Sequence, residues 1–341
     1  MSNILCGLNN RGNTCFLNTC IQLLINVDEL TNYFLKNEYI SDLNNNFKLN
    51  NLKKTKDVHL SYHYAELVKQ MSSNNNKLID PISFHKAIQK SDDFFSGFEQ
   101  QDSQEVMLLI LDLLNDGLNY EIEINYKGKI ENDYDKLMVE SIKAWDTILK
   151  NKYSIVSDLF YGLFINKIYE NKNNKVLSKT FESFNMLTLS VMNNNLYSML
   201  DIFFKNEKLD DEYLDEKTNK KCIVSREIKI MSAPKYLIIV LKKYTSSRQK
   251  MNDEIIFPLD ELNLSKYCMG YDSFKCLYNL ISVGCHVGNL QCGHYFSIVK
   301  KNDNNWYNCN DSDVSLFDIE KHKSILYRSS YILVYKKQLS I

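Results

Sequence analysis

Apolar residues recur at helical spacing through much of the first part of the chain. After Thr14 an apolar run continues as far as Ile25, and over 101–115 the apolar side chains fit a repeat of 3.6 residues. Apolar positions with this repeat form one face of a helix, which is expected to pack into a core. Helices are also predicted over 62–71 and around Trp145. The region up to about residue 150 is therefore expected to be mostly helical.

The pattern changes beyond about residue 155, where runs rich in aromatic and β-branched residues predict strands. The runs before residue 233 are expected to form a protruding antiparallel sheet, and those from 234 onward a second sheet. Helices followed by strands predict the α+β class. The predicted strands cover 159–168, 184–191, 221–231, 236–244, 278–286, 294–300 and 331–336.

Length and composition narrow the class of protein. The 341 residues can bury a substantial core, in one large domain or two. A formal net charge of −1 does not suggest a surface for nucleic acid. Nine cysteines, an odd number without disulfide-framework spacing, indicate free thiols in a reducing compartment. Asparagine runs at 44–46, 74–76 and 193–195 are predicted to be surface loops.

We expect neither a membrane segment nor a secretion signal. The longest strongly apolar run, 236–241, is far shorter than the roughly 20 residues that span a bilayer. The first residues lack the charged and apolar pattern of a leader. A cytoplasmic protein is therefore expected, with nuclear or virion-associated placement left open. It is expected to act as a monomer without nucleic-acid or membrane partners.

Cys15 is the first candidate for chemistry. It follows a polar, glycine-containing turn and stands on the first turn of a predicted helix. Unpaired backbone N–H groups and the positive end of the helix dipole favour a nucleophilic thiolate there. A free cysteine is more often a small buried apolar residue, and Cys20, deeper in the same helix, is predicted to be one. A nucleophilic Cys15 also requires a base, an orienter for that base and oxyanion donors.

His294 is the best candidate for the base. It follows Gly293 at the start of a predicted strand, where the ring is held rigidly and a substrate backbone has space to approach. A polar turn and a second strand predict a hairpin that returns Asn310 and Asp311 to the side of His294. An oxygen of either residue can accept the imidazole N–H and turn the other ring nitrogen to Cys15. A solvated hairpin with a surface histidine fits this spacing equally well.

Six segments stand out along the chain. They are GLNNRGNTCFLNTCIQLL (7–24), FEQQDSQEVMLLILDLL (98–114), SIVSDLFYG (154–162), PKYLIIVLKKY (234–244), FPLDELNLSKY (257–267), and YNLISVGCHVGNLQCGHYFSIVK (278–300) with WYNCNDSDV (306–314) and SYILVYKK (330–337). Together they resemble the motifs of the ubiquitin-specific proteases, a papain-like deubiquitinase family, in which the first is the cysteine box and the last the histidine box. The resemblance runs from about residue 5 to 336 in the right order, which makes it far more specific than one motif.

The resemblance implies a fold and a set of catalytic residues. It implies a papain-like single catalytic domain over 1–341, with a helical thumb at about 5–154, β-rich fingers at 155–233 and an antiparallel β palm at 234–341. The implied nucleophile and general base are Cys15 and His294. The other implied catalytic residues are Asn310 as third member of the triad, Asp311 as a supporting or substitute orienter, and Asn10 as the side-chain donor to the oxyanion.

The helix at 101–115 is implied to lie beside a channel for the C-terminal tail of ubiquitin, which carries arginines. Asp102 and Glu105 share a helix face, and carboxylates suit guanidinium groups. Without the resemblance, a solvated N-terminal turn in which the dipole favours acids explains both residues. The other implied channel residues are Gln100, Gln104, His286 and Tyr295.

The fingers depart from the family pattern, because many members carry two Cys-x-x-Cys pairs that hold a structural zinc. Here 165–176 contains no cysteine and 215–227 contains only Cys222. One thiolate cannot form a four-ligand site, so neither zinc nor another cofactor is expected. The fingers must then depend on strand pairing and packing. Cys285, Cys292 and Cys309 are predicted to be reduced core or lining residues.

The implied function is hydrolysis after the C-terminal glycine of ubiquitin, which releases ubiquitin from an isopeptide or peptide bond. Two alternatives stay open at this point. The chain can be a catalytically weak or inactive ubiquitin-binding scaffold, or a protease for a ubiquitin-like modifier.

Overall fold

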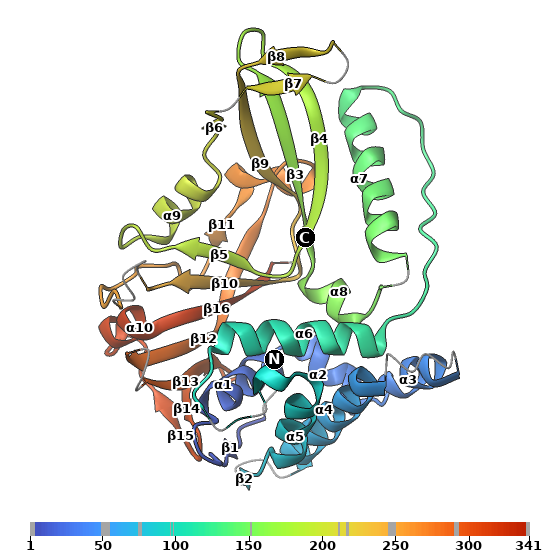
Figure 1. Ribbon diagram of the computed structural model, residues 1–341. Coiled ribbons are helices and arrows are strands. Elements are labelled where there is room, and N and C mark those ends of the chain that lie inside the picture. The colour runs from blue at the N-terminus through green and yellow to red at the C-terminus, as the bar shows by residue number, and fades with distance from the viewer. Residues whose placement is uncertain are drawn as a thin grey trace.

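The computed structural model describes residues 4–48, 55–73, 77–95, 97, 99–150, 152–210, 212–215, 218–244, 250–289 and 293–338. Figure 1 shows helices gathered at one end, a broad sheet beside them, and a narrower sheet that projects away from both. This arrangement confirms the predicted α+β class. Within the described residues no helix is both long enough and apolar enough to cross a membrane.

The helical lobe is built around α1, all eleven residues of which are buried. Helix α1 packs on α6 and α2, and α4 packs on α6 and α5. The predicted helices over 101–115 and 62–71 are confirmed. The first begins at Ser103 and ends at Leu118, and the second extends beyond the predicted range at both ends. The helices of this lobe are α1 (Cys15–Ile25), α2 (Asp28–Leu35), α3 (Tyr39–Lys48), α4 (Thr55–Ser73), α5 (Ile82–Ser91) and α6 (Ser103–Leu118).

The predicted loop at 44–46 is wrong, because these residues lie inside α3. Tyr39 and Leu43, four residues apart, are both buried and anchor one face of the helix. Packing of that face overrides the weak helix propensity of asparagine. The run at 193–195 does lie in a loop before α9 (Leu196–Phe203), as predicted. The run at 74–76 falls outside the described residues.

The broad sheet, which we call the palm, carries the histidine-box strands. Its order is β15-β14-β13-β12-β16-β10-β5, and β11 also pairs with β12. Neighbouring strands are antiparallel except β5 and β10, which are parallel. The strands are β5 (Leu187–Ser190), β10 (Tyr236–Lys242), β11 (Leu262–Asn263), β12 (Leu277–Gly288), β13 (Gly293–Lys300), β14 (Trp306–Asn310), β15 (Asp313–Phe317) and β16 (Ser330–Lys337), with α10 (Lys323–Ser329) before β16.

The projecting sheet, which we call the fingers, has the order β4-β3-β9-β6, and a separate β7–β8 pair lies at its tip (Figure 1). Helix α7 runs alongside, and α8 lies near the base. The elements are α7 (Asp133–Leu149), α8 (Ile155–Phe160), β3 (Gly162–Glu170), β4 (Lys175–Phe184), β6 (Glu207–Lys208), β7 (Tyr213–Asp215), β8 (Lys220–Cys222) and β9 (Val224–Ser232).

Two predicted strands in this region differ from the structure, one in where it begins and one because it is two separate strands. The strand predicted to start at residue 159 starts at Gly162, because Ser154 and Ser157 form a capping box that begins α8. The strand predicted over 184–191 is two strands, since β4 ends at Phe184 and β5 belongs to the palm. Strand β4 itself was not predicted, because most of its side chains are exposed or only half-buried and give no apolar run.

Packing and hydrogen bonds hold the fingers together. At the base, Leu163, Ile165 and Met231 form a buried cluster against which Trp145 of α7 packs. Near the tip, the Asn171 N–H donates to the backbone carbonyl of Ile223 at 3.0 Å. Among the described residues no three histidine, cysteine or acidic side chains are grouped so as to hold a metal ion.

We predict that the fold survives metal chelation. Excess 1,10-phenanthroline is expected to leave Tm within about 1 °C of its value without chelator, because packing and strand pairing replace a metal. As a positive control, Ile165→Ala is expected to lower the free energy of unfolding by about 2–5 kcal/mol by opening a cavity. Urea unfolding and thermal melts measure both. A fall in Tm of several degrees with chelator would refute the metal-free account.

Candidate active site

Cys15 begins α1 and is buried at the seam between the helical lobe and the palm, where α1 packs against β13 and β14 (Figure 1). The loop before it is shaped by Asn10, whose Oδ1 accepts from the backbone N–H of Gly12 at 3.0 Å and of Thr14 at 3.1 Å. Gly12 and Asn13 take positive φ angles of 95° and 56° in the turn. Residue types that tolerate this conformation therefore set the direction in which the chain enters α1.

His294 lies on β13, and the predicted hairpin brings Asn310 at the end of β14 beside its ring. The His294 Nε2–H donates to Asn310 Oδ1 at 2.6 Å, which leaves Nδ1 for Cys15. The hydrogen bond with Cys15 and the bond to Asn310 raise the pKa of His294 to about 9, although partial burial opposes them. The structure thus brings together the three side chains that the sequence proposed.

Asp311 contacts the loop and helix around Cys15 and makes no hydrogen bond to the histidine ring. Its Oδ2 accepts from Asn10 Nδ2 and its Oδ1 from Asn18 Nδ2, both at 2.8 Å. Its backbone carbonyl accepts from the Leu8 N–H at 2.7 Å. In this geometry Asn310 holds the ring, while Asp311 holds the segment that carries Cys15.

These contacts orient both the carbonyl oxygen and the NH2 group of the Asn10 side chain. Its oxygen is used by the loop, and one N–H is used by Asp311. A primary amide has two N–H groups, so one hydrogen on Nδ2 stays available for an oxygen bound beside Cys15. This arrangement fits an oxyanion donor that is fixed before substrate arrives.

Asn18 was not among the predicted site residues. It lies on α1, is only 2 % exposed, and binds Asp311. A buried amide requires a hydrogen-bond partner. The position of Asn18 among apolar residues of α1 therefore indicates that it binds a polar group elsewhere in the chain. The identity of the partner could not be inferred, because Asp311 lies 293 positions away in the sequence.

Gln100 binds the residue before the histidine. Its Nε2 donates to the carbonyl of Gly293 at 2.6 Å, and its Oε1 accepts from the Gly293 N–H at 3.0 Å. A Cβ at residue 293 would lie 2.2 Å from His286 Nε2, so a glycine is required there by the packed histidine. The space predicted beside Gly293 for a substrate backbone is therefore occupied by His286 and Gln100 in this structure.

Asp102 caps α6, since its Oδ1 accepts from the Gln104 N–H at 2.7 Å. Its carboxylate also accepts from the Tyr331 hydroxyl at 2.7 and 2.8 Å. Glu105 is exposed one turn away, and partial burial together with Asp102 raises the pKa of Glu105. The structure thus assigns Asp102 a capping role and leaves Glu105 exposed.

An aromatic cluster of His286, Tyr295 and Tyr331 packs beside Asp102. The ring centroids of His286 and Tyr295 lie 4.4 Å apart, and those of Tyr295 and Tyr331 lie 6.1 Å apart. Burial, aided by the charge of Lys250, lowers the pKa of His286 to about 4, so this ring is neutral near pH 7. Tyr331 was not predicted as part of the site.

The other cysteines fit the predicted core roles where the structure describes them. Cys20, Cys285 and Cys309 are buried. Burial raises the pKa of the Cys285 thiol to about 12 and that of Cys309 to about 11. These thiols are therefore protonated and unreactive near pH 7. Cys292 falls outside the described residues.

We predict that the His294 imidazole titrates with a pKa of about 9. Because the ordinary value is about 6.5, the bound proton stabilises the folded state fully below that pH, and the contribution is lost as pH rises through about 9. In Asn310→Ala the pKa is expected to be lower, because the acceptor for Nε2–H is gone. NMR of the histidine ring carbons measures both values, with Asn305→Ala as control. An unchanged pKa in Asn310→Ala would contradict the role of this bond.

Comparison with known proteins identifies relatives along almost the whole chain. The sequence model of the family described as ubiquitin carboxyl-terminal hydrolase matches residues 6–335. Ubiquitin carboxyl-terminal hydrolase Usp2 of Drosophila melanogaster is 30% identical over 347 residues, which cover 98% of this chain and 35% of the relative. Ubiquitin carboxyl-terminal hydrolase 2 of Homo sapiens is 28% identical, covering 97% of this chain and 55% of the relative. The chain thus spans about a third to a half of these curated relatives.

Solved structures give the same result for the fold. Ubp8 in the SAGA DUB module, bound to ubiquitin aldehyde, is 22% identical with a TM-score of 0.74, and the match covers 99% of this chain and 70% of that chain. The module bound to monoubiquitin matches with the same values. Since the family match extends over residues 6–335, the chain belongs to the ubiquitin carboxyl-terminal hydrolase family.

Proposed function

We propose that this chain is a cysteine-dependent deubiquitinase that hydrolyses the bond after the C-terminal glycine of ubiquitin. The observation that carries the proposal is the hydrogen-bonded series Cys15, His294 and Asn310, assembled from both ends of the chain, with Asn10 bound to the backbone of Thr14 directly before Cys15. Family membership supports the reaction, and the similar Ubp8 structure contains ubiquitin aldehyde.

In the proposed mechanism the Cys15 thiolate attacks the carbonyl carbon of the terminal glycine. The free N–H of Asn10 donates to the oxyanion, and the imidazolium of His294 gives its proton to the leaving lysine amine. Water, deprotonated by His294, then hydrolyses the thioester and restores Cys15. Asn310 keeps the ring in the tautomer that both proton transfers need.

For the substrate tail we propose a path between the start of α6 and the palm. The Asp102 and Glu105 carboxylates supply negative charge for tail arginines, while Tyr295 and His286 form an apolar wall. The Gln100 amide offers one donor and one acceptor, which is the pair that an extended peptide backbone requires. A tail on this path takes the place of Gly293 as the partner of Gln100.

We infer that the described elements act as one catalytic domain. The helical lobe lies within the proposed thumb at about 5–154, the fingers strands lie within 155–233, and the palm strands lie within 234–341 except β5, which comes from the proposed fingers segment. Helix α7 belongs to the proposed thumb segment but runs beside the fingers (Figure 1). The fingers and palm are proposed to hold the globular body of ubiquitin. A monomeric cytoplasmic enzyme remains our proposal for its state and location.

We predict that a ubiquitin probe with a C-terminal electrophile is captured covalently by the wild-type protein and not by Cys15→Ala, because only Cys15 supplies the attacking thiolate. Cys222→Ala, which removes a more exposed thiol, is the matched control and is expected to be captured normally. Intact-mass analysis reads the adduct, and parallel probes for ubiquitin-like modifiers test specificity. Binding of ubiquitin without capture would overturn the enzyme in favour of a scaffold, and capture of another modifier alone would replace ubiquitin as substrate.

We predict that Asn10→Ala lowers kcat by about 10²–10³-fold with a small change in KM, because one oxyanion donor is lost in the transition state. Asn9→Ala removes a neighbouring amide and is expected to keep kcat within about twofold. Initial rates on a ubiquitin C-terminal fluorogenic substrate measure both. A loss confined to KM in Asn10→Ala would show that Asn10 binds the ground state and is not an oxyanion donor.

A further inference from the structure

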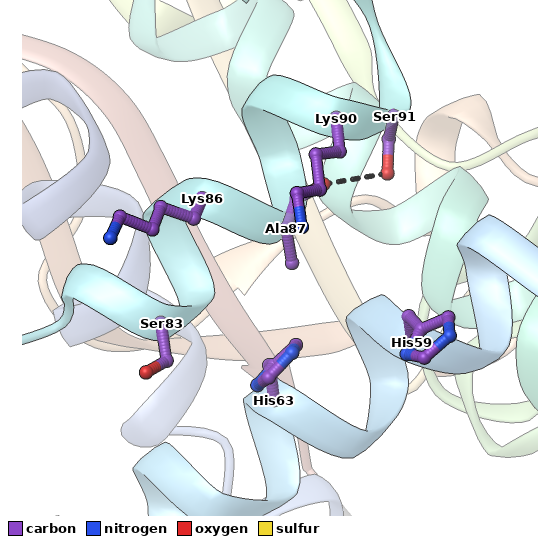
Figure 2. Close-up of a pocket in the computed structure, with 7 residues that line it drawn as sticks. All are labelled: His59, His63, Ser83, Lys86, Ala87, Lys90 and Ser91. Atoms are coloured by element: carbon purple, nitrogen blue, oxygen red, sulfur yellow. Dashed lines mark hydrogen bonds between the residues drawn. The ribbon is translucent and has the colours of Figure 1, made fainter.

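A cavity of about 410 Å³ lies between α4 and α5, on the helical lobe and apart from the catalytic side chains. Figure 2 shows His59 and His63 of α4 on one side and side chains of α5 on the other. The size lies within the range of small-molecule sites, which is roughly 300–1,000 Å³. The polar side chains that line it are His59, His63, Ser83, Lys86, Lys90 and Ser91.

The lining is basic on both walls. His59 and His63 are one helical turn apart on α4, and Lys86 and Lys90 are one turn apart on α5. Of the described residues that line the cavity, none is acidic. Neither lysine forms an ion pair with any residue that the structure describes, although both are exposed at the rim. Two lysine side chains therefore line the cavity without a counter-ion from the described residues.

The charges around His63 oppose one another. Burial, then His59 and then Lys90, lower the pKa of His63, and Glu66 of the same helix raises it less. Glu66 is itself paired with Lys69 at 3.3 Å. A negatively charged ligand would relieve this repulsion, because an anion favours the charged form of nearby lysine and histidine side chains.

We propose that this cavity binds a phosphomonoester. A phosphate group carries about −1.5 to −2 charges and three acceptor oxygens, which match two lysines and the imidazole N–H groups. Lysine binds phosphate as a point charge, so two lysines suit a group that carries close to two negative charges. The Ser83 hydroxyl adds a further donor, while that of Ser91 is used on the Ala87 carbonyl at 2.8 Å.

The volume exceeds that of a phosphate ion and leaves room for an organic carrier. The carrier can be a small metabolite or a phosphorylated side chain, and both present the same phosphomonoester to the cavity. The site is independent of the proposed hydrolysis, so its test needs no turnover of ubiquitin.

The test is NMR of the histidine ring carbons in the full chain, with the His63 signal assigned through His63→Gln. Inorganic phosphate and O-phosphoserine are the probes, and sodium chloride at matched ionic strength removes the general effect of screening. Each probe is expected to raise the pKa of His63 by about 1, since a bound anion stabilises its charged form. The His322 signal, from another part of the chain, is expected to be unchanged.

Charge-removing variants test whether the lysines form the site. Lys86→Gln with Lys90→Gln is expected to weaken binding of O-phosphoserine by about tenfold or more. Lys136→Gln with Lys143→Gln removes the same charge from exposed positions on α7 and is expected to leave binding within about twofold. The double variant Lys86→Arg, Lys90→Arg keeps both charges and is expected to retain binding of O-phosphoserine. An effect of chloride equal to that of phosphate, or equal losses in the two glutamine variants, would overturn the site.

A phosphoserine peptide in place of the free amino acid separates the two carriers. Tighter binding of the peptide than of O-phosphoserine would assign the site to phosphorylated proteins, and equal or weaker binding would assign it to small phosphorylated molecules. Either result supports a phosphomonoester as the ligand of the cavity. A failure of both probes to bind would refute the proposal.

Discussion

The proposed catalytic arrangement depends on the contacts of the Asp311 carboxylate. Cys15 and His294 belong to different lobes, and the proposed reaction requires their side chains to meet within hydrogen-bond distance. Asp311 follows directly after Asn310 and binds Asn10 and Asn18 on either side of Cys15. One residue thus joins the strand that orients the histidine to the helix that carries the thiol. Since α1 is buried along its whole length, it cannot shift away without breaking the core.

Two further contacts hold the same seam farther along. Gln100 binds the backbone of Gly293, and Asp102 accepts from the Tyr331 hydroxyl. Both link the start of α6 to the palm, on the side where the substrate tail is proposed to lie. At the thiol the seam is therefore held by the buried α1. Beside the proposed path of the substrate tail it is closed by polar groups that can exchange partners. Such an exchange exposes few apolar groups, so its free-energy cost is small compared with that of moving α1.

The features that were predicted correctly from the sequence each depend on residues within one short segment. The helix after Thr14 and the hairpin that carries His294 and Asn310 follow from periodicity and turn residues within short segments, and the structure contains both. The contacts of Asn10 with Asp311 could not be derived in this way, because the two residues are 301 positions apart. The errors have local causes of another kind: a serine cap converts the start of one predicted strand into α8, and buried residues keep asparagines in α3. Periodicity identifies an element, but its boundaries depend on individual caps and partners.

Asn310 and Asp311 bind different partners, and this difference has a chemical consequence. A neutral amide orients His294, so its proton is retained mainly through the bond with Cys15, which is the first cause of its raised pKa. The negative charge lies one residue later and accepts one N–H of Asn10, which fixes the orientation of that amide beside the start of α1. An aspartate at 310 would place a second carboxylate beside Asp311 and raise the cost of ionising both. With an amide at 310, the single carboxylate of Asp311 holds Asn10 and Asn18, and acts on His294 only through its charge and without a hydrogen bond to the ring.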